Sequence, residues 1–412
     1  MRLLNRRTRR NSSRRRPVAV LATVLIASLL VLAGPLGCSQ DKRTQHEQAT
    51  QQWNSTRAAV MYSLAKEQYQ TGNFDKCRQT ITTAERMDPK NAKVRVLSGK
   101  LAIEQGQLEL AEKELAIARE SDPKEAEADY LSGVVCQRWQ KPEAAYEYYT
   151  SAAEKAPNEL PYVMARAEML VTMDRVSEAL ALLQEKVVFF EHSAAIRDAT
   201  GELLVQQGRY ADAVEMLRQA SILATNDNLV REHLAMAQYF NKQYREASDN
   251  FARLLKDPKN QKRADLYLAQ GECEMQLGKA HEARGSFELA SRLSPSSVQC
   301  WTGIGKAALQ ANDLRRADLA LKRAVALDGN SAETQLLLGY LRLKEDKLKE
   351  SLAAFQRASQ LDRSDTVSLC MIGYVLEKAG KSSKAMEYYG RALKLKPNDE
   401  MARQMMASTK DD

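Results

Sequence analysis

Cysteine and histidine side chains are the groups in this sequence most able to bind a metal ion or act as nucleophiles. Five cysteines follow the first 50 residues: Cys77, Cys136, Cys273, Cys300 and Cys370. Their number is odd and none belongs to a Cys-x-x-Cys pair, so neither a disulfide framework nor a zinc site is predicted. We expect these residues to be buried within helices as small apolar side chains.

The histidines are equally dispersed, at His46, His192, His233 and His281. No His-Glu-x-x-His motif accompanies them, so the sequence predicts no metal site. Gly380-Lys381-Ser382 resembles the end of a phosphate-binding loop, but Val375 occupies the position of the first glycine that such a loop requires. A nucleophile elbow is also missing. We therefore expect a protein that is not an enzyme and has no catalytic residue, metal or cofactor.

The elements that carry these residues repeat every 34 positions, from residue 58 to about residue 398. One column holds only glycine or alanine: Ala65, Gly99, Gly133, Ala167, Gly201, Ala235, Gly271, Gly305, Gly339 and Gly373. Twelve positions later, a second column holds only small residues: Cys77, Ala111, Ala145, Ala179, Ala213, Ala247, Ala283, Ala317, Ser351 and Ala385. Such a period indicates a solenoid of helical hairpins. The register shifts once, by two residues, around residues 258–261.

Each unit contains two helical segments separated by a short break. The residues in the breaks are Gly72, Gly106, Gln140, Asp174, Gly208, Lys242, Gly278, Asn312, Asp346 and Gly380. Glycine, and less readily these polar residues, adopts the left-handed conformation that ends many helices. The small columns predict close contact between paired helices, so Gly339→Leu should overpack this contact and cost roughly 1–3 kcal/mol or more. At the position 19 residues after the first column, most units carry alanine, but the fourth unit carries Lys186. We therefore expect a longer or bent second helix in that unit, over residues 178 to about 191.

Prolines follow several of the second helical segments, at Pro89, Pro123, Pro157, Pro295 and Pro397. Together, the small residues, the glycine turn, the alanine seam and these prolines resemble the tetratricopeptide repeat. The segment Trp301-Thr302-Gly303-Ile304-Gly305 carries the Trp-x-x-apolar-Gly opening of that family. The resemblance covers ten units, residues 58–398, and implies an all-α fold: a right-handed α-solenoid of about ten helical hairpins. Residues 399–412 are expected to form a capping helix and tail.

The net charge of +8 comes from the N-terminus. Residues 1–16 contain eight arginines and no acidic residue, so subtracting eight from 61 basic residues leaves 53, against 53 acidic residues. The rest of the chain is therefore neutral, and it lacks the basic surface that phosphate backbones require. We expect no nucleic-acid partner.

The N-terminus has the order of residues that is typical of a bacterial export signal. Residues 2–16 are strongly basic, residues 18–36 are apolar, and Gly37-Cys38 follow. This ending resembles a lipoprotein signal, which implies lipidation of Cys38, although Pro35 stands where leucine is usual. The alternative is an uncleaved membrane helix, since about 19 apolar residues can just span a bilayer. Either anchor places the repeats outside the cytoplasm, in the cell envelope, with residues 39–57 as a polar tether.

In the tetratricopeptide family, the first helix of each hairpin lines a concave groove that binds protein segments. The corresponding column here is basic at its start, acidic in the middle and aromatic at its end, and tyrosine and methionine are typical binding anchors. The alternative is a set of solvated helix surfaces. The candidate groove positions are Tyr62, Lys66, Tyr69, Lys100, Tyr130, Glu168, Glu202, Met236, Tyr239, Glu272, Lys306, Tyr340, Leu343 and Tyr374, with Asp198 and Glu232 beside them.

These patterns predict a membrane-tethered extracytoplasmic scaffold that binds protein or peptide segments and has no small-molecule substrate. Its partner would bring a basic stretch to the acidic middle of the groove. One alternative is an accessory subunit of an envelope machine, such as a protease adaptor or a polysaccharide-export, pilus or secretion assembly. Another is an enzyme with a site that the sequence does not reveal.

Overall fold

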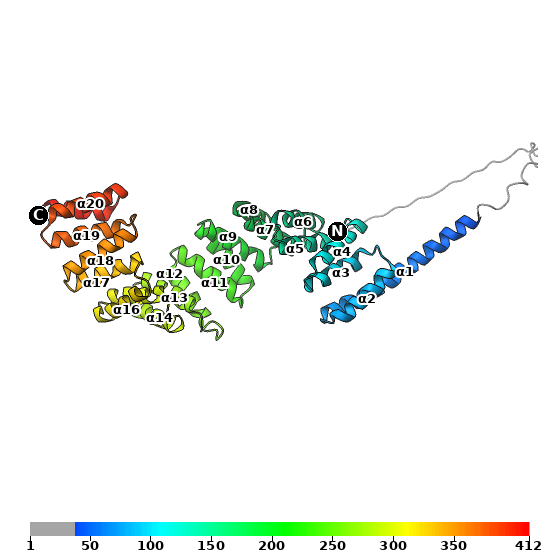
Figure 1. Cartoon of the computed structure of the whole chain (residues 1–412), viewed down its shortest axis with the longest axis horizontal. Helices are drawn as coiled ribbons and strands as arrows, with labels where there is room; N and C mark the ends of the chain where they lie inside the picture. The colour runs from blue at the N-terminus through cyan, green and yellow to red at the C-terminus, as the bar shows by residue number, and fades with distance from the viewer. Residues whose placement is uncertain (1–37, 412) are drawn as a thin grey trace, which may run out of the picture. The chain divides into compact units, whose positions relative to one another are not determined.

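The computed structural model describes residues 38–411, which form 21 α-helices and no β-strand (Figure 1). The predicted all-α helical repeat is confirmed. The first helices of the hairpins are α1 (Cys38–Gln70), α3 (Ala92–Glu104), α5 (Ala126–Arg138), α7 (Leu160–Thr172), α9 (Ala194–Gln206), α11 (Asn228–Phe240), α13 (Ala264–Gln276), α15 (Val298–Gln310), α17 (Ala332–Lys344) and α19 (Thr366–Lys378). The second helices are α2 (Phe74–Met87), α4 (Leu108–Ser121), α6 (Pro142–Lys155), α8 (Val176–Lys186), α10 (Tyr210–Leu223), α12 (Tyr244–Leu254), α14 (Ala280–Leu293), α16 (Leu314–Leu327), α18 (Leu348–Leu361) and α20 (Ser382–Leu395), after which comes α21 (Glu400–Asp411).

The N-terminal part of the structure is a single long helix. Residues 39–57, predicted as a polar tether, form the first part of α1. No glycine or proline interrupts residues 38–71, and most of them are good helix formers, which explains the continuous helix. Residues 1–37 of the predicted signal or anchor segment lie outside the described chain, and lipid attachment at Cys38 stays a prediction. Within residues 38–411, no helix combines the length and apolar character needed to cross a membrane.

The chain divides into two compact units, and the division falls between Leu131 and Ser132 inside α5. Within each unit, the two helices of a hairpin pack against one another, as α1 does with α2 and α17 with α18. Second helices also contact the first helix of the next pair, and first helices contact the first helices of neighbouring pairs, as α9 does with α11 and α13 with α15. Odd-numbered helices therefore form one layer of each unit and even-numbered helices the other.

The two columns of small residues are buried, as the sequence predicted. At each glycine of the first column, the space for a side chain is filled by a large residue 16 positions later. A Cβ added at these glycines would lie only 2.4–2.7 Å from that residue. The pairs are Gly99 and Leu115, Gly133 and Tyr149, Gly201 and Leu217, Gly271 and Phe287, Gly305 and Leu321, Gly339 and Phe355, and Gly373 and Tyr389.

The turns between paired helices also follow the prediction. All ten break residues have positive φ angles, between 57° and 75°. Side chains of Asn91, Asp227, Ser297, Ser331 and Asp365 accept hydrogen bonds from backbone N–H groups in the first turn of the helix that follows each of them. Side-chain caps thus mark the start of many odd-numbered helices. A residue with positive φ follows the end of each odd-numbered helix in the ten hairpins.

The expectation of a longer or bent second helix in the fourth unit is wrong. Helix α8 ends at Lys186 and has 11 residues, whereas α6 and α10 have 14. After Val187 the backbone closes tighter turns, with the N–H of Phe189 bonded to the carbonyl oxygen of Lys186 (3.0 Å). Helix α12 is equally short and ends at Leu254. In both hairpins the helix stops at the position where the other units carry alanine.

Candidate functional site

The candidate groove residues of each unit lie on its odd-numbered helices, on a surface that we call the odd-helix face of that unit. Neighbouring odd helices exchange side-chain hydrogen bonds across this face. Residues that are one repeat apart therefore meet: Gln137 and Glu168 are 31 positions apart, and Asp198 and His233 are 35 apart. A position on one first helix thus faces a position about 34 residues later on the next.

The structure leaves three of the candidate residues exposed: Lys66, Glu168 and Glu202. The others are half-buried: Tyr62, Tyr69, Lys100, Tyr130, Met236, Tyr239, Glu272, Lys306, Tyr340, Leu343 and Tyr374. Half-burial holds these larger side chains in place, which lowers the entropy lost when a partner immobilises them.

In the first unit, the odd-helix face has a small pocket of about 160 Å³, lined in part by Tyr62, Lys66, Tyr69 and Lys100. The Nζ of Lys100 lies 3.0 Å from Glu127 Oε1. The hydroxyl of Tyr69 donates a hydrogen bond to Glu104 Oε1 (3.3 Å). Burial, together with Glu104, raises the pKa of Tyr69 to about 12, so this hydroxyl stays protonated.

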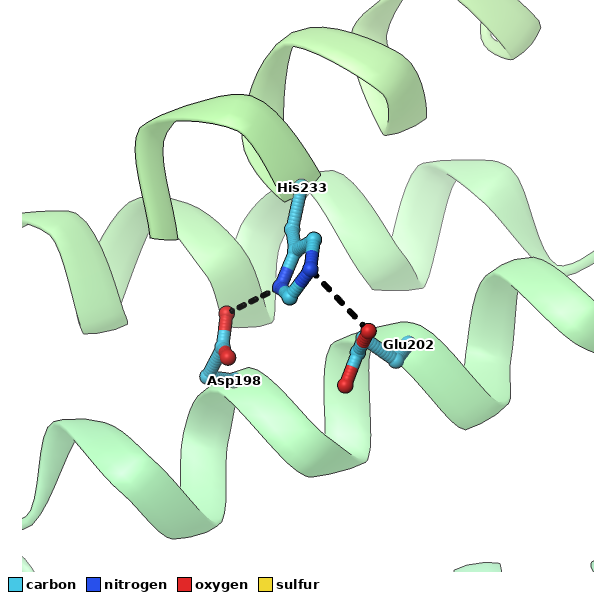
Figure 2. Close-up of side chains that lie close together, drawn as sticks. All are labelled: Asp198, Glu202 and His233. Atoms are coloured by element: carbon cyan, nitrogen blue, oxygen red, sulfur yellow. Dashed lines mark hydrogen bonds and ion pairs between the residues drawn. The ribbon is translucent and has the colours of Figure 1, made fainter. Parts of the chain in front are cut away.

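In the second unit, one cluster brings together three titratable side chains, Asp198, Glu202 and His233 (Figure 2). Asp198 and Glu202 lie one turn apart on α9, and His233 reaches between them from α11. His233 Nδ1 is 2.9 Å from Asp198 Oδ1, and His233 Nε2 is 3.1 Å from Glu202 Oε1. Burial raises the pKa of Glu202, against the opposing effect of His233, and hydrogen bonding to Asp198 raises the pKa of His233.

The other acidic positions of the column also have partners. Glu168 Oε1 accepts a hydrogen bond from the side-chain amide of Gln137 (2.9 Å). Lys306 Nζ lies 3.9 Å from Glu272 Oε2 and 3.9 Å from Glu333 Oε1. Burial raises the pKa of Glu272, and Lys306 opposes this shift. The acidic middle of the column is thus a series of bridged carboxylates rather than one uniform patch.

The aromatic and methionine side chains of the column are partly exposed to solvent and also pack against neighbouring residues. Tyr340 stacks edge-to-face on Phe355, with ring centroids 5.3 Å apart. Lys378 Nζ lies 5.5 Å from the ring centroid of Tyr374. Met236 and Tyr239 pack against the core cluster around Phe251. Because these side chains are supported from below, they present fixed apolar surface on the odd-helix face.

The sequence did not reveal the histidine cluster. His233 belongs to no motif of neighbouring residues, because its partners lie 35 and 31 positions earlier in the chain. The 34-residue period contained the signal, because His233 follows by one the repeat equivalent of Asp198. The five cysteines of the hairpins, by contrast, are buried, as predicted.

Comparison with protein-family models matches residues 227–411 to the C-terminal domain of cilia and flagella-associated protein 70. The tetratricopeptide-repeat model matches residues 62–115 and 96–159. No curated protein matches the chain in sequence.

Several solved structures are similar to the chain at low sequence identity. The Cut9–Hcn1 hetero-tetramer of APC/C matches with 15% identity and a TM-score of 0.47, over 85% of this chain and 76% of that chain. Yeast Tom70 matches with 12% identity and a TM-score of 0.45, over 86% and 88%. A tetratricopeptide repeat protein from Parabacteroides merdae ATCC 43184 matches with 19% identity and a TM-score of 0.42, over 61% and 98%. The family-model matches and the buried hairpin seams together identify the chain as one that contains tetratricopeptide repeats.

Proposed function

We propose that this protein is a non-catalytic scaffold that binds a protein segment along the odd-helix face of its second unit. The observation that carries the proposal is the grouping of fixed apolar side chains with carboxylates on α11 and α13. Met236 and Tyr239 are half-buried there, and Glu272 lies close enough to Tyr239 to help burial raise the pKa of that hydroxyl. Supported aromatic and methionine side chains are typical anchors of protein interfaces.

The charges on this face favour a partner segment that combines basic and apolar residues. Glu168 and Glu202 are exposed on α7 and α9, and Glu272 is half-buried on α13. Glu168 is paired with a side-chain amide, Glu202 with a histidine, and Glu272 with a lysine at 3.9 Å. An arginine or lysine of a bound segment would make a shorter charge-assisted contact with these carboxylates than Lys306 does with Glu272.

Charge reversal tests this proposal. Changing Glu168, Glu202 and Glu272 together to lysine is expected to remove partners that crosslink to the wild-type protein in intact cells. The matched control reverses three exposed glutamates on even-numbered helices of the same region: Glu185, Glu215 and Glu246. An unchanged set of partners in the first variant, or equal loss in the control, would contradict the proposal. A second variant with glutamine at positions 168, 202 and 272 separates lost attraction from added repulsion.

We also propose that the scaffold is anchored to a membrane by its N-terminus, with the repeats outside the cytoplasm. The order of eight arginines, an apolar stretch and Gly37-Cys38 supports this arrangement. Mass spectrometry of the mature protein separates the two anchors, because acylated Cys38 at the N-terminus indicates a lipoprotein and an intact basic leader indicates a membrane helix. Recovery of an unacylated chain in the soluble cytoplasmic fraction would overturn both.

A further inference from the structure

The Asp198, Glu202 and His233 cluster has the donor atoms of a metal site. One donor atom from each residue lies within 4.8 Å of the others. Imidazole nitrogen and carboxylate oxygen together suit Zn²⁺ and similar transition metals, whereas Mg²⁺ and Ca²⁺ prefer sites built from oxygen alone.

The geometry assigns different roles to the two carboxylates. Asp198 Oδ1 lies 2.9 Å from His233 Nδ1, so a proton on Nδ1 is held by Asp198 and the ring orientation is fixed. This arrangement leaves Nε2 as the donor nitrogen, and Nε2 lies 3.1 Å from Glu202 Oε1 (Figure 2). Two donors bound tetrahedrally to one zinc ion, with bonds of about 2.0–2.1 Å, are separated by about 3.3 Å. The Nε2 and Oε1 atoms are therefore already at the spacing of a ligand pair.

The charge of the cluster also favours a cation. Within the described chain, no lysine or arginine pairs with Asp198 or Glu202, and His233 is the group that bridges them. The nearby Arg197 donates hydrogen bonds to the carbonyl oxygens of Phe190 and Ser193 instead. When a metal ion replaces the proton on His233 Nε2, two carboxylates and a neutral imidazole carry a charge of −2, which a divalent ion balances.

The two helices that supply the ligands are held by the hairpin seams. Gly201, which lies between Asp198 and Glu202 in the sequence of α9, packs against Leu217 of α10. On α11, Ala235 is fully buried two residues after His233. The side chain of Asp198 is 13% exposed, and that of Glu202 is 52% exposed. The site is thus rigid at its base and open to solvent on the odd-helix face, where water or a partner's side chain can complete the coordination.

We propose that His233 Nε2 and the Glu202 carboxylate bind a divalent transition-metal ion of the zinc type, with Asp198 as the positioning residue. The site lies on the surface proposed for partner binding, but metal binding needs no partner and is tested without one. The tests of the two proposals can therefore fail separately.

Zinc titration of the full-length, untagged chain in detergent, after removal of metals with a chelator, tests the proposal by calorimetry. We expect one Zn²⁺ per chain at this site, and Co²⁺ as a probe should give the visible absorption of nitrogen and oxygen coordination. Glu202→Gln and His233→Gln should each weaken Zn²⁺ binding at least tenfold. Asp198→Asn should weaken it about 10–100-fold, the typical loss when the group that orients a histidine ligand is changed.

His281→Gln provides the matched control, because His281 is an exposed histidine on α14. It should bind Zn²⁺ as the wild type does. Loss of binding in Glu202→Gln or His233→Gln, which leave every cysteine in place, would exclude the buried cysteines as the source of the signal. Circular dichroism verifies folding, and Glu202→Gln keeps the test valid if His233→Gln unfolds, since the Glu202 side chain is largely exposed. Absence of Zn²⁺ binding by the wild type, equal binding by Glu202→Gln, or equal affinity for Mg²⁺ would overturn the proposal.

Discussion

The ring of Phe355 on α18 occupies the space into which a side chain on Gly339 of α17 would project. A Cβ at residue 339 would lie 2.4 Å from both Cδ1 and Cε1 of Phe355. Beside this contact, the buried hydroxyl of Ser351 donates a hydrogen bond to the carbonyl oxygen of Gly339 (2.8 Å). The two helices cannot separate to admit a side chain without lengthening this bond. Close approach of the hairpin therefore depends on glycine at position 339.

Gly339→Ala is expected to lower the free energy of unfolding by roughly 1–3 kcal/mol, because the added methyl group overpacks the seam. Gly285→Ala in α14 is the matched control. Nothing lies within 4 Å of a Cβ at residue 285, so this change should stabilise the helix by about 0.5–1 kcal/mol. Urea denaturation, with hydrogen exchange at α17 and α14, measures both effects. Shifts of the same sign in the two variants would contradict the packing argument.

The hairpin turns yield a second pair of opposite effects. Lys242 has a φ of 61°, a conformation that costs a residue with a side chain roughly 1–2 kcal/mol, whereas glycine adopts it freely. Lys242→Gly should therefore stabilise the protein by about 0.5–1 kcal/mol after the greater entropy of unfolded glycine is subtracted.

The reverse change is Gly278→Ala, at φ 75° with open space around the Cβ position. It should destabilise the protein by about 1 kcal/mol through the backbone alone. Thermal unfolding compares the two variants with the wild type. If Lys242→Gly lowers the midpoint, contacts of the lysine side chain outweigh its backbone strain.

The hairpin fold could be predicted because each unit repeats the same local constraints. Gly339 and its equivalents mark where helices touch, and residues such as Asn312 mark where the chain reverses. Ten repetitions make a weak signal at one position into a clear one. The predicted contacts lie within a hairpin, where the two residues in contact are always 12 or 16 positions apart in the sequence.

Features that few units share could not be predicted in the same way. The early end of α8 at Lys186 depends on the tighter turns after Val187, and among the described hairpins only α12 ends equally early, at Leu254. The cluster around His233 depends on contact between successive hairpins, and its three members are not adjacent in the chain. Scanning for ligand residues 31–35 positions apart would have found it, because neighbouring first helices meet at that spacing.

The five cysteines of the hairpins are expected to resist alkylation in the folded protein. All five are buried, and burial raises the pKa of Cys273 to about 12 and that of Cys370 to about 11. The reactive thiolate is therefore scarce at neutral pH. In a Cys38→Ser variant, a maleimide reagent should label almost no thiol in buffer and five thiols in denaturant. Rapid labelling of the native variant would show that a hairpin seam opens readily.

Asp399 links the last helix, α21, to the hairpin before it. We therefore expect the stability of α21 to decrease in acid. Its Oδ1 accepts a hydrogen bond from the backbone N–H of Ala402 (3.0 Å), and its Oδ2 accepts one from the hydroxyl of Thr366 (2.7 Å). These two bonds, first that of Thr366, lower the pKa of Asp399. At neutral pH, Asp399→Ala should cost about 0.5–2 kcal/mol, as for other N-cap residues.

The sign of the pH effect follows from the lowered pKa. As pH falls below about 4, the usual pKa of aspartate, the unfolded chain takes up a proton before the folded one does, so the unfolding free energy decreases. The stabilisation by ionised Asp399 is therefore present above that pH and is lost as the pH passes through the folded-state pKa. Asp399→Asn should retain the cap but lack this pH dependence, because asparagine caps helices as well as aspartate does.

Urea unfolding of the wild type and both Asp399 variants at pH 7 and pH 3, with hydrogen exchange of α21, measures the prediction. The difference between wild type and Asp399→Ala should shrink at the lower pH. Asp249→Ala, a change of an exposed aspartate on α12, controls for the general effect of removing a negative charge. A difference of the same size at both pH values would show that the cap stabilises α21 through its hydrogen bonds alone, without a contribution from the ionised carboxylate.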